Sequence, residues 1–340
     1  MKETLNLCVI GTGRIGRVHA ENLVYRIPEA NLVAVSDIFV EAAEKVAAEL
    51  GIPAAYQDHR LALEDKSIDA VLICSSTDTH AQIIEEAAEA GKQIFCEKPI
   101  ALDLAKIDRA LAAVERAGVK LQIGFNRRFD PNFRRVRQVI ATGQIGEPHL
   151  LRITSRDPAP PPIEYVKVSG GIFLDMTIHD FDMARFLIGA EVESIYAAGG
   201  VLVDPAIGEA GDVDTALVTL HFANGALGAI DNSRQAVYGY DQRVEVFGSA
   251  GCVTADNDYP NTARISDAQR VHRDLPLNFF MERYTESYVA EIEAFVDCIL
   301  HDTPPTVTGL DGRVPVVMGY AAKRSLDEGR PVKLREVDVT

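Results

Sequence analysis

The feature that most constrains the fold is a glycine-rich turn near the N-terminus. Residues 5–10 form a run that is apolar except for Asn6, GTGRIG follows at 11–16, and apolar residues then recur with a helical period to about Tyr25. A buried parallel strand, a tight turn and a helix N-terminus together bind a pyrophosphate, because backbone amides and the helix dipole point at it. The candidate contacts in this turn are Gly11, Gly13, Arg14, Ile15 and Gly16.

A carboxylate follows at the spacing that a dinucleotide site requires. A second apolar run, 32–36, ends at Asp37, about twenty residues past the last glycine, where a carboxylate would hold the hydroxyls of the adenosine ribose. No Arg follows at 38–40 to receive a 2′-phosphate, so NAD is favoured over NADP. The alternative role for Asp37 is to cap the helix predicted over 40–50.

Strands and helices continue to alternate to residue 124. Strands are predicted at 70–74, 93–96 and 120–124, with helices at 79–90 and 103–117 between them. This alternation predicts a doubly wound parallel sheet with its ligand at the carboxyl ends of the strands. The polar residues at those ends are Ser75, Ser76, Thr77, Glu97, Lys98, Asn126 and Arg127.

Lys98 has the chemistry of a catalytic cation. It follows a buried strand and precedes Pro99. An ammonium group beside an alcohol oxygen lowers the pKa of that alcohol and stabilises developing alkoxide charge, so the site needs no metal for this purpose. An ion pair with Glu97 or a capping role for Lys98 is the alternative.

The second half of the chain has a different pattern. A helix is predicted over 131–142, and strands over 149–155, 194–198, 215–222, 226–233, 242–248 and 251–256, mostly without helices between them; helices follow at 288–299 and 311–328. Asn224 and Gly225 separate two of the strands and predict a hairpin. The fold class is therefore α/β: a doubly wound Rossmann domain (1–125), then an α+β domain (126–340) with a large open, mainly antiparallel sheet.

The segment SGGIFLDMTIHDFD (169–182) supplies a second candidate for chemistry. A helix predicted over 175–187 would place Asp175 and His179 on one face, where a carboxylate can hold an imidazole in one tautomer and stabilise its protonated form. Taken alone, a histidine and an aspartate on a helix are more often a surface pair or a satisfied core pair than a catalytic dyad.

Composition excludes several partners. The 340 residues suffice for two domains, and the formal charge of −16 argues against nucleic acid and anionic membranes. A basic cluster at 127–137 has apolar residues interspersed and is interpreted as a charged helix face. No apolar run reaches the ~18 residues of a membrane span, the N-terminus has no signal-peptide layout, and the five cysteines are expected to be reduced core residues, so a cytoplasmic protein is expected.

Together these segments resemble one family. GTGRIG with Asp37, CEKP at 96–99 and SGGIFLDMTIHD at 169–180 are similar to the glucose-fructose oxidoreductase and inositol dehydrogenase family, Gfo/Idh/MocA, over nearly the whole chain. Within that family the segments at 126–127, 155–162, 170–182 and 238–248 are most similar to the inositol 2-dehydrogenase branch.

The resemblance implies specific roles. Lys98, Asp175 and His179 match the catalytic triad, and Asp37 the adenosine-ribose ligand. Asn126, Arg127, Asp157 and Tyr240, with the triad, match the contacts to polyol hydroxyls. The implied reaction is oxidation of myo-inositol to 2-keto-myo-inositol (scyllo-inosose) with NAD: His179 takes the hydroxyl proton, Asp175 supports it and Lys98 stabilises the oxygen. A homotetramer, or a homodimer, is also implied, because an open sheet with one broad face commonly associates.

Three other functions remain compatible with the sequence. A dehydrogenase of another polyol or sugar, such as scyllo-inositol, glucose or xylose, would share every motif. A glycosidase that uses NAD transiently would release no net NADH. A nucleotide-binding regulator without catalysis would have no reason to keep Lys98, Asp175 and His179 together.

Overall fold

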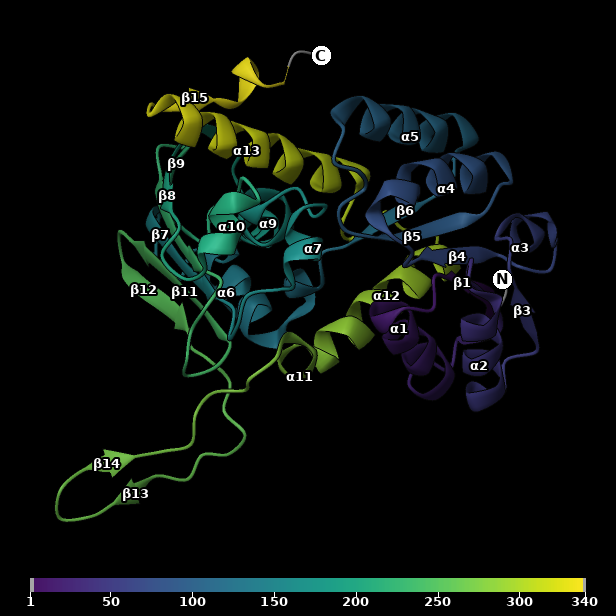
Figure 1. Cartoon of the computed structure of the whole chain (residues 1–340), viewed down its shortest axis with the longest axis horizontal. Coiled ribbons are helices and arrows are strands. Elements are labelled where there is room, and N and C mark those ends of the chain that lie inside the picture. Colours follow the sequence, from purple (N-terminus) through teal and green to yellow (C-terminus); the bar gives the residue numbers. More distant parts are fainter. Residues whose placement is uncertain (1–2, 339–340) are drawn as a thin grey trace. The chain divides into compact units, whose positions relative to one another are not determined.

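The computed structural model describes residues 3–338, which divide into two compact units (Figure 1). The first unit contains the residues up to Phe129 together with Glu286–Val314. The second contains Asp130–Thr285 and the residues from Pro315 onward. The sequence had suggested a single boundary after residue 125 and gave no indication that 286–314 returns to the first unit.

The first unit is a doubly wound parallel sheet, as predicted. Its strand order is β3-β2-β1-β4-β5-β6, and every neighbouring pair is parallel. The strands are β1 (Leu5–Ile10), β2 (Ala30–Ser36), β3 (Ala54–Tyr56), β4 (Ala70–Ile73), β5 (Gln93–Glu97) and β6 (Leu121–Gly124). The helices are α1 (Arg14–Tyr25), α2 (Val40–Leu50), α3 (Arg60–Glu64), α4 (Thr77–Glu89), α5 (Leu104–Ala117) and α12 (Thr285–Leu300); a 3₁₀ turn, η1 (Asn126–Phe129), follows β6.

Helix α12 belongs to the first unit because its apolar face completes the core there. Val289, Ile292 and Phe295 are buried in the same cluster as strand residues of β1 and β5. The rings of Phe95 and Phe295 lie 5.9 Å apart, and the side chain of Gln122 in β6 donates to the carbonyl of Glu291 at 2.7 Å. Packing between residues so distant in sequence leaves no local signal. For this reason the sequence did not predict that residues 286–314 belong to the first unit.

The second unit is built on a seven-stranded sheet that is mainly antiparallel, also as predicted. The order is β12-β11-β7-β10-β9-β8-β15, and only β7 and β10 pair in parallel. The Asn224–Gly225 hairpin is confirmed: Gly225 has φ +88° and the Asn224 side chain accepts from the Ala226 amide. The strands are β7 (Pro148–Arg156), β8 (Val192–Gly200), β9 (Thr215–Phe222), β10 (Leu227–Ser233), β11 (Asp241–Gly248), β12 (Gly251–Ala255) and β15 (Val332–Lys333).

Helices cover one face of this sheet, and α9 packs on β7 and β10. A two-stranded hairpin, β13 (Ile265–Ser266) and β14 (Val271–His272), extends away from the rest of the unit (Figure 1). The helices are α6 (Pro131–Ala141), α7 (Ile163–Val166), α8 (Ile172–Asp175), α9 (Thr177–Ile188), α10 (Pro205–Glu209), α11 (Phe280–Arg283) and α13 (Gly309–Glu328), and a 3₁₀ turn, η2, spans Leu334–Glu336. Among residues 3–338, no helix is long and apolar enough to cross a membrane.

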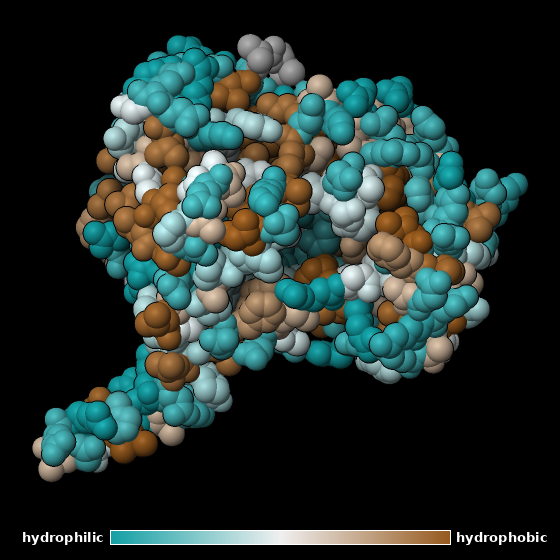
Figure 2. Space-filling model, viewed as in Figure 1, coloured by the Kyte–Doolittle hydropathy of each residue, from teal (hydrophilic) through white to brown (hydrophobic). Residues whose placement is uncertain are grey.

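The opposite face of the sheet exposes apolar side chains. Leu227, Leu150 and Phe247 are direct partners across β10, β7 and β11, and each is exposed by more than 40%. Leu217 on β9 is 63% exposed. The space-filling view shows hydrophobic residues gathered on the surface over this sheet (Figure 2).

Candidate active site

The three glycines of the turn between β1 and α1 have two different structural roles. A Cβ on Gly11, which has φ +93°, would lie 2.6 Å from the Ser75 amide nitrogen, and one on Gly16 would lie 1.8 Å from the Gly11 carbonyl oxygen. Around Gly13 no atom lies within 4 Å of the Cβ position. Gly11 and Gly16 therefore allow the strand and helix to approach closely, while Gly13 leaves open space at a helix N-terminus with no side-chain cap, as pyrophosphate binding requires. Arg14 and Ile15 form the first turn of α1.

Asp37 is fixed beside this turn. Its carboxylate accepts hydrogen bonds from the Thr12 amide at 2.7 Å and the Thr12 hydroxyl at 2.9 Å, and from the Phe39 amide at 3.0 Å. Helix α2 begins after Phe39, so Asp37 is not its N-cap. The alternative capping role is thus not what the structure contains, and the half-buried carboxylate is held at the end of β2.

The loops after β4 and β5 are joined by a histidine that the sequence did not single out. His80 places Nε2 at 2.9 Å from the Ser75 carbonyl oxygen and Nδ1 at 2.8 Å from the Pro99 carbonyl oxygen. Ser76 and Thr77 begin α4, and the Ser75 hydroxyl is hydrogen-bonded to Thr79. His80 therefore links the loop after β4 to the loop after β5.

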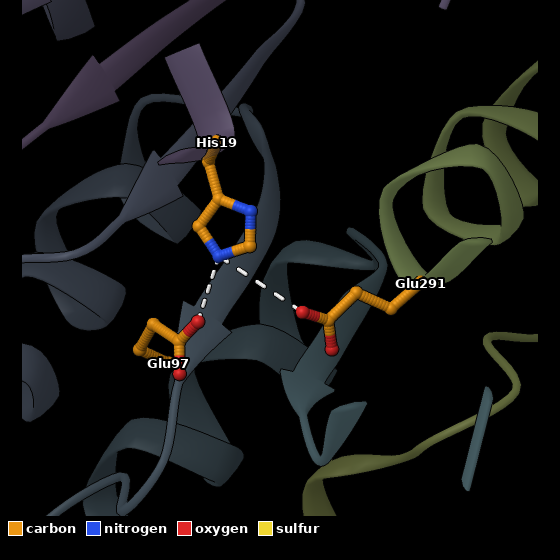
Figure 3. Close-up of side chains that lie close together, drawn as sticks. All are labelled: His19, Glu97 and Glu291. Carbon is orange, nitrogen blue, oxygen red and sulfur yellow. Dashed lines mark hydrogen bonds and ion pairs between the residues drawn. The ribbon is translucent and has the colours of Figure 1, made fainter. Parts of the chain in front are cut away.

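Glu97 is the last residue of β5, and Lys98 follows it. Both are half-buried, and the Lys98–Pro99 peptide bond is cis. Glu97 Oε1 lies 2.7 Å from His19 Nε2 (Figure 3). Asn126 and Arg127 lie in η1 with 3% and 6% exposure, and Asn126 Nδ2 has no hydrogen-bond partner among residues 3–338.

In the second unit, two side chains bind the carboxylate of Asp175. Its Oδ1 accepts from the Tyr165 hydroxyl at 2.8 Å, and its Oδ2 lies 3.0 Å from Arg234 Nη1. The Arg234 side chain is 1% exposed and also lies 3.8 Å from Asp212. Burial and the Asp175 carboxylate raise the pKa of Tyr165, so its hydroxyl stays a donor.

The helix predicted over 175–187 is wrong in one detail: it does not run continuously. Asp175 ends the short helix α8, and α9 begins at Thr177. The Thr177 hydroxyl bonds to the Ile172 carbonyl and to the Asn232 side chain, and such local side-chain bonds compete with regular helix geometry. Gly171, Asp175 and His179 nevertheless share a face, since they alone are not buried within 171–185.

Two glycines and a buried amide position this segment. Gly170 and Gly171 have φ values of +87° and +81°, and a Cβ on Gly171 would lie 2.8 Å from Asp212 Oδ1. The absence of a side chain at Gly171 therefore allows the close approach of the Asp212 carboxylate, which accepts from the Ile172 amide. Asn232 ties α9 to β10 through Asp180, at 2.8 Å.

The two remaining predicted contacts have different surroundings. Asp157 is half-buried after β7, where its backbone bonds to Ser233 and Ala236. Tyr240 is 7% exposed, and its ring packs edge-on against Tyr284 at 6.0 Å. The basic cluster does not form one patch, because Arg127 and Arg128 are buried while Arg134 and Arg135 are exposed.

The structure thus brings the predicted cofactor residues together along one edge of the first unit, and places Asp175 and His179 together in the second. Lys98 lies in the first unit. Sequence reasoning missed the residues that hold these groups, namely Thr12, His19, His80, Tyr165, Asp212, Asn232, Arg234 and Glu291. Most of these contacts join residues at least 25 positions apart, so spacing carried no signal for them.

Comparison with known proteins gives two family matches. The model described as "Oxidoreductase family, NAD-binding Rossmann fold" matches residues 5–125, and the GFO/IDH/MocA C-terminal domain matches residues 133–254. Together they cover most of both units, so the first unit is an NAD-binding domain.

Individual relatives match over almost their whole length. The chain is 53% identical over 333 residues to a myo-inositol 2-dehydrogenase of Thermotoga maritima, covering 98% of this chain and 99% of the relative. It is 49% identical to an inositol 2-dehydrogenase of Rhizobium meliloti, covering 97% and 99%. A crystal structure of scyllo-inositol dehydrogenase from Lactobacillus casei, with bound NAD(H) and scyllo-inositol, superposes with a TM-score of 0.91 at 30% identity, covering 97% and 99%.

Proposed function

The chain belongs to the Gfo/Idh/MocA family of NAD-dependent oxidoreductases, and from that premise we propose that it oxidises myo-inositol to 2-keto-myo-inositol (scyllo-inosose). The observation that supports myo-inositol as the substrate is the sequence identity of 49–53% to inositol 2-dehydrogenases over nearly the full chain. The residues present also fit NAD. Gly13 leaves room at a helix N-terminus. Asp37 is fixed beside the same turn by the Thr12 amide and has no Arg at the next three positions, which supports the proposed contact with the adenosine ribose.

Bound NAD supplies the hydride acceptor, and the side chains of this chain supply the rest of the chemistry. In the proposal, His179 accepts the proton of the reacting hydroxyl through its imidazole. Lys98 donates to the same oxygen and stabilises it as negative charge develops. Asn126, Arg127, Asp157 and Tyr240 bind the other hydroxyls, and an unpaired polar group opposite the wrong epimer costs about 1 to 3 kcal/mol.

Asp175 supports the imidazolium form of His179 in this mechanism. It lies four residues earlier on the same face, and both of its carboxylate oxygens already have donors, Tyr165 and Arg234. A carboxylate fixed by a buried guanidinium cannot readily turn toward solvent. It therefore provides a preorganised negative charge rather than a mobile base.

A substrate screen tests the proposal. Purified protein is assayed for NADH production with myo-inositol, scyllo-inositol, chiro-inositol, glucose and xylose, each with NAD and NADP. The expected result is the highest kcat/KM with myo-inositol and NAD. A higher kcat/KM with scyllo-inositol or a sugar would reassign the substrate within the same chemistry, and no net NADH with any polyol would refute the dehydrogenase.

We further propose that the chain works as a homotetramer in the cytoplasm. The exposed row Leu227, Leu150 and Phe247 on the open sheet supports association through that face, and all five cysteines are free thiols, which suits a reducing compartment. Leu150→Asp should dissociate the oligomer in analytical ultracentrifugation. An unchanged mass would place the interface elsewhere.

A further inference from the structure

A buried cluster of titratable groups lies in the core of the first unit, and two of its three members, His19 and Glu291, have no role in the proposed chemistry. His19 comes from α1, Glu97 from the end of β5 and Glu291 from α12 (Figure 3). His19 Nε2 lies 2.7 Å from Glu97 Oε1 and 3.9 Å from Glu291 Oε1. The side chains of His19 and Glu291 are fully buried, whereas that of Glu97 is 13% exposed.

The hydrogen bonds of this cluster limit where its protons can be. His19 Nδ1 and both carboxylate oxygens of Glu291 are buried and have no hydrogen-bond partner among residues 3–338. If His19 were protonated and Glu291 ionised, the Nδ1–H of His19 would have no acceptor, and the Glu291 carboxylate would be buried without a hydrogen bond, 3.9 Å from the imidazole. With His19 neutral and Glu291 protonated, only uncharged polar groups lack hydrogen bonds, so the neutral arrangement costs less.

The surroundings favour the same arrangement. The centroids of the Phe95 and Tyr288 rings lie 5.3 and 5.8 Å from that of the His19 imidazole, and His19 has no surface exposed to solvent. Burial raises the pKa of Glu291 well above its ordinary value, and the nearby Glu97 charge raises it further. The thiols of Cys74 and Cys96 are the other titratable groups close to these carboxylates, and burial raises the pKa of each.

We propose that His19 and Glu291 are positioning residues for Glu97: Glu291 is a neutral acid in the folded chain, and His19 donates its Nε2–H to Glu97, holding that carboxylate at the cofactor edge. This rests on the proposed NAD site, in which Glu97 is one of the predicted contacts at the carboxyl ends of the parallel strands. The consequence is that ionisation of Glu291 at alkaline pH places a second negative charge beside Glu97 and draws the imidazole between two carboxylates. NAD binding then weakens.

A metal ion held by the same three residues is the competing explanation. Nitrogen and oxygen ligands at ~2.0–2.2 Å from a tetrahedral zinc are separated by more than 3 Å. The separation of 2.7 Å between His19 Nε2 and Glu97 Oε1 is instead that of a charge-assisted hydrogen bond. The geometry therefore favours a proton over a metal.

The first test compares Glu291→Gln with Glu293→Gln, the same substitution at an exposed position of α12. Because the pKa of Glu291 is raised by folding, its stabilising contribution is complete below the unfolded pKa and is lost as pH rises. The unfolding constant of the wild-type apoprotein, relative to Glu291→Gln, should rise by up to about tenfold per pH unit above pH 5. Glu293→Gln should follow the wild type.

The second test measures the Kd for NAD by calorimetry between pH 6 and pH 10. Wild-type affinity should fall at alkaline pH, while that of Glu291→Gln should change little. At pH 7, His19→Leu should weaken NAD binding by about tenfold, and His19→Gln, whose amide can still donate to Glu97, should recover most of this loss.

Parallel pH profiles for the wild type and Glu291→Gln, in both stability and NAD affinity, would overturn the proposal. So would a stoichiometric metal in the purified protein whose removal mimics Glu291→Gln. A wild-type chain that does not bind NAD would refute the proposed function instead. The stability comparison does not depend on NAD and would still decide the protonation of Glu291.

Discussion

The pairing of Arg234 with Asp175 makes the sharpest prediction for a single side chain. Arg234 is 1% exposed and contacts Asp175 and Asp212 at 3.0 and 3.8 Å. Removing one partner of a buried ion pair costs about 3–5 kcal/mol. For Arg234→Met we expect a cost at the lower end of this range. The side chains of Asp175 and Asp212 are 13% and 14% exposed, and the Tyr165 hydroxyl still donates to Asp175.

Urea denaturation at pH 7 measures this loss, with Arg134→Met as the control because Arg134 is an exposed arginine of the same unit. Arg234→Met should lower the free energy of unfolding by about 3 kcal/mol and kcat by at least about tenfold. Adding Asp175→Asn should recover about 1 kcal/mol or more, since the uncompensated charge is then removed. If Arg234→Met is no less stable than the control, or the second substitution recovers nothing, the ion pair does not hold Asp175.

Three further predictions concern the cofactor turn and the catalytic groups. Lys98→Ala and His179→Ala should each lower kcat with myo-inositol by at least about a hundredfold while changing the Kd for NAD little, and near-normal turnover of either variant would remove that residue from the mechanism. Asp37→Ala should shift the NAD/NADP ratio of kcat/KM toward NADP by about tenfold or more, whereas an unchanged ratio would argue against the ribose contact. Gly13→Ala should unfold at the wild-type temperature but bind NAD more weakly, whereas Gly16→Ala should lose thermal stability because its Cβ would meet the Gly11 carbonyl; equal stability of the two variants would contradict these separate roles.

Many helices and strands were predicted well from the sequence, because their hydrophobic periodicity is a property of neighbouring residues. The run 5–10 and the strand 215–222 were predicted with the bounds observed in the structure, as was the helix 40–50. Strand β3 was missed because three residues are too few to show a period. The hairpin β13–β14 was missed because its strands have two residues each.

The supporting contacts of the site could not be predicted, because they are made between segments far apart in sequence. Arg234 is 59 residues from Asp175, and Glu291 is nearly two hundred residues from Glu97, so no spacing rule connects them. Motif reasoning identified the groups proposed for chemistry, whereas burial and hydrogen bonding in the folded chain identify the groups that hold them. The break at Met176 likewise depends on Asn232, a residue of another strand.

The most direct test of the central claim is an isotope-transfer measurement. Wild-type protein is supplied with NAD and myo-inositol carrying deuterium on C2, and the reduced cofactor is analysed by mass spectrometry. The proposal predicts one deuterium per reduced nicotinamide and a slower turnover than with unlabelled substrate. Reduced cofactor without deuterium, or no net reduction of NAD, would contradict hydride transfer from that ring carbon.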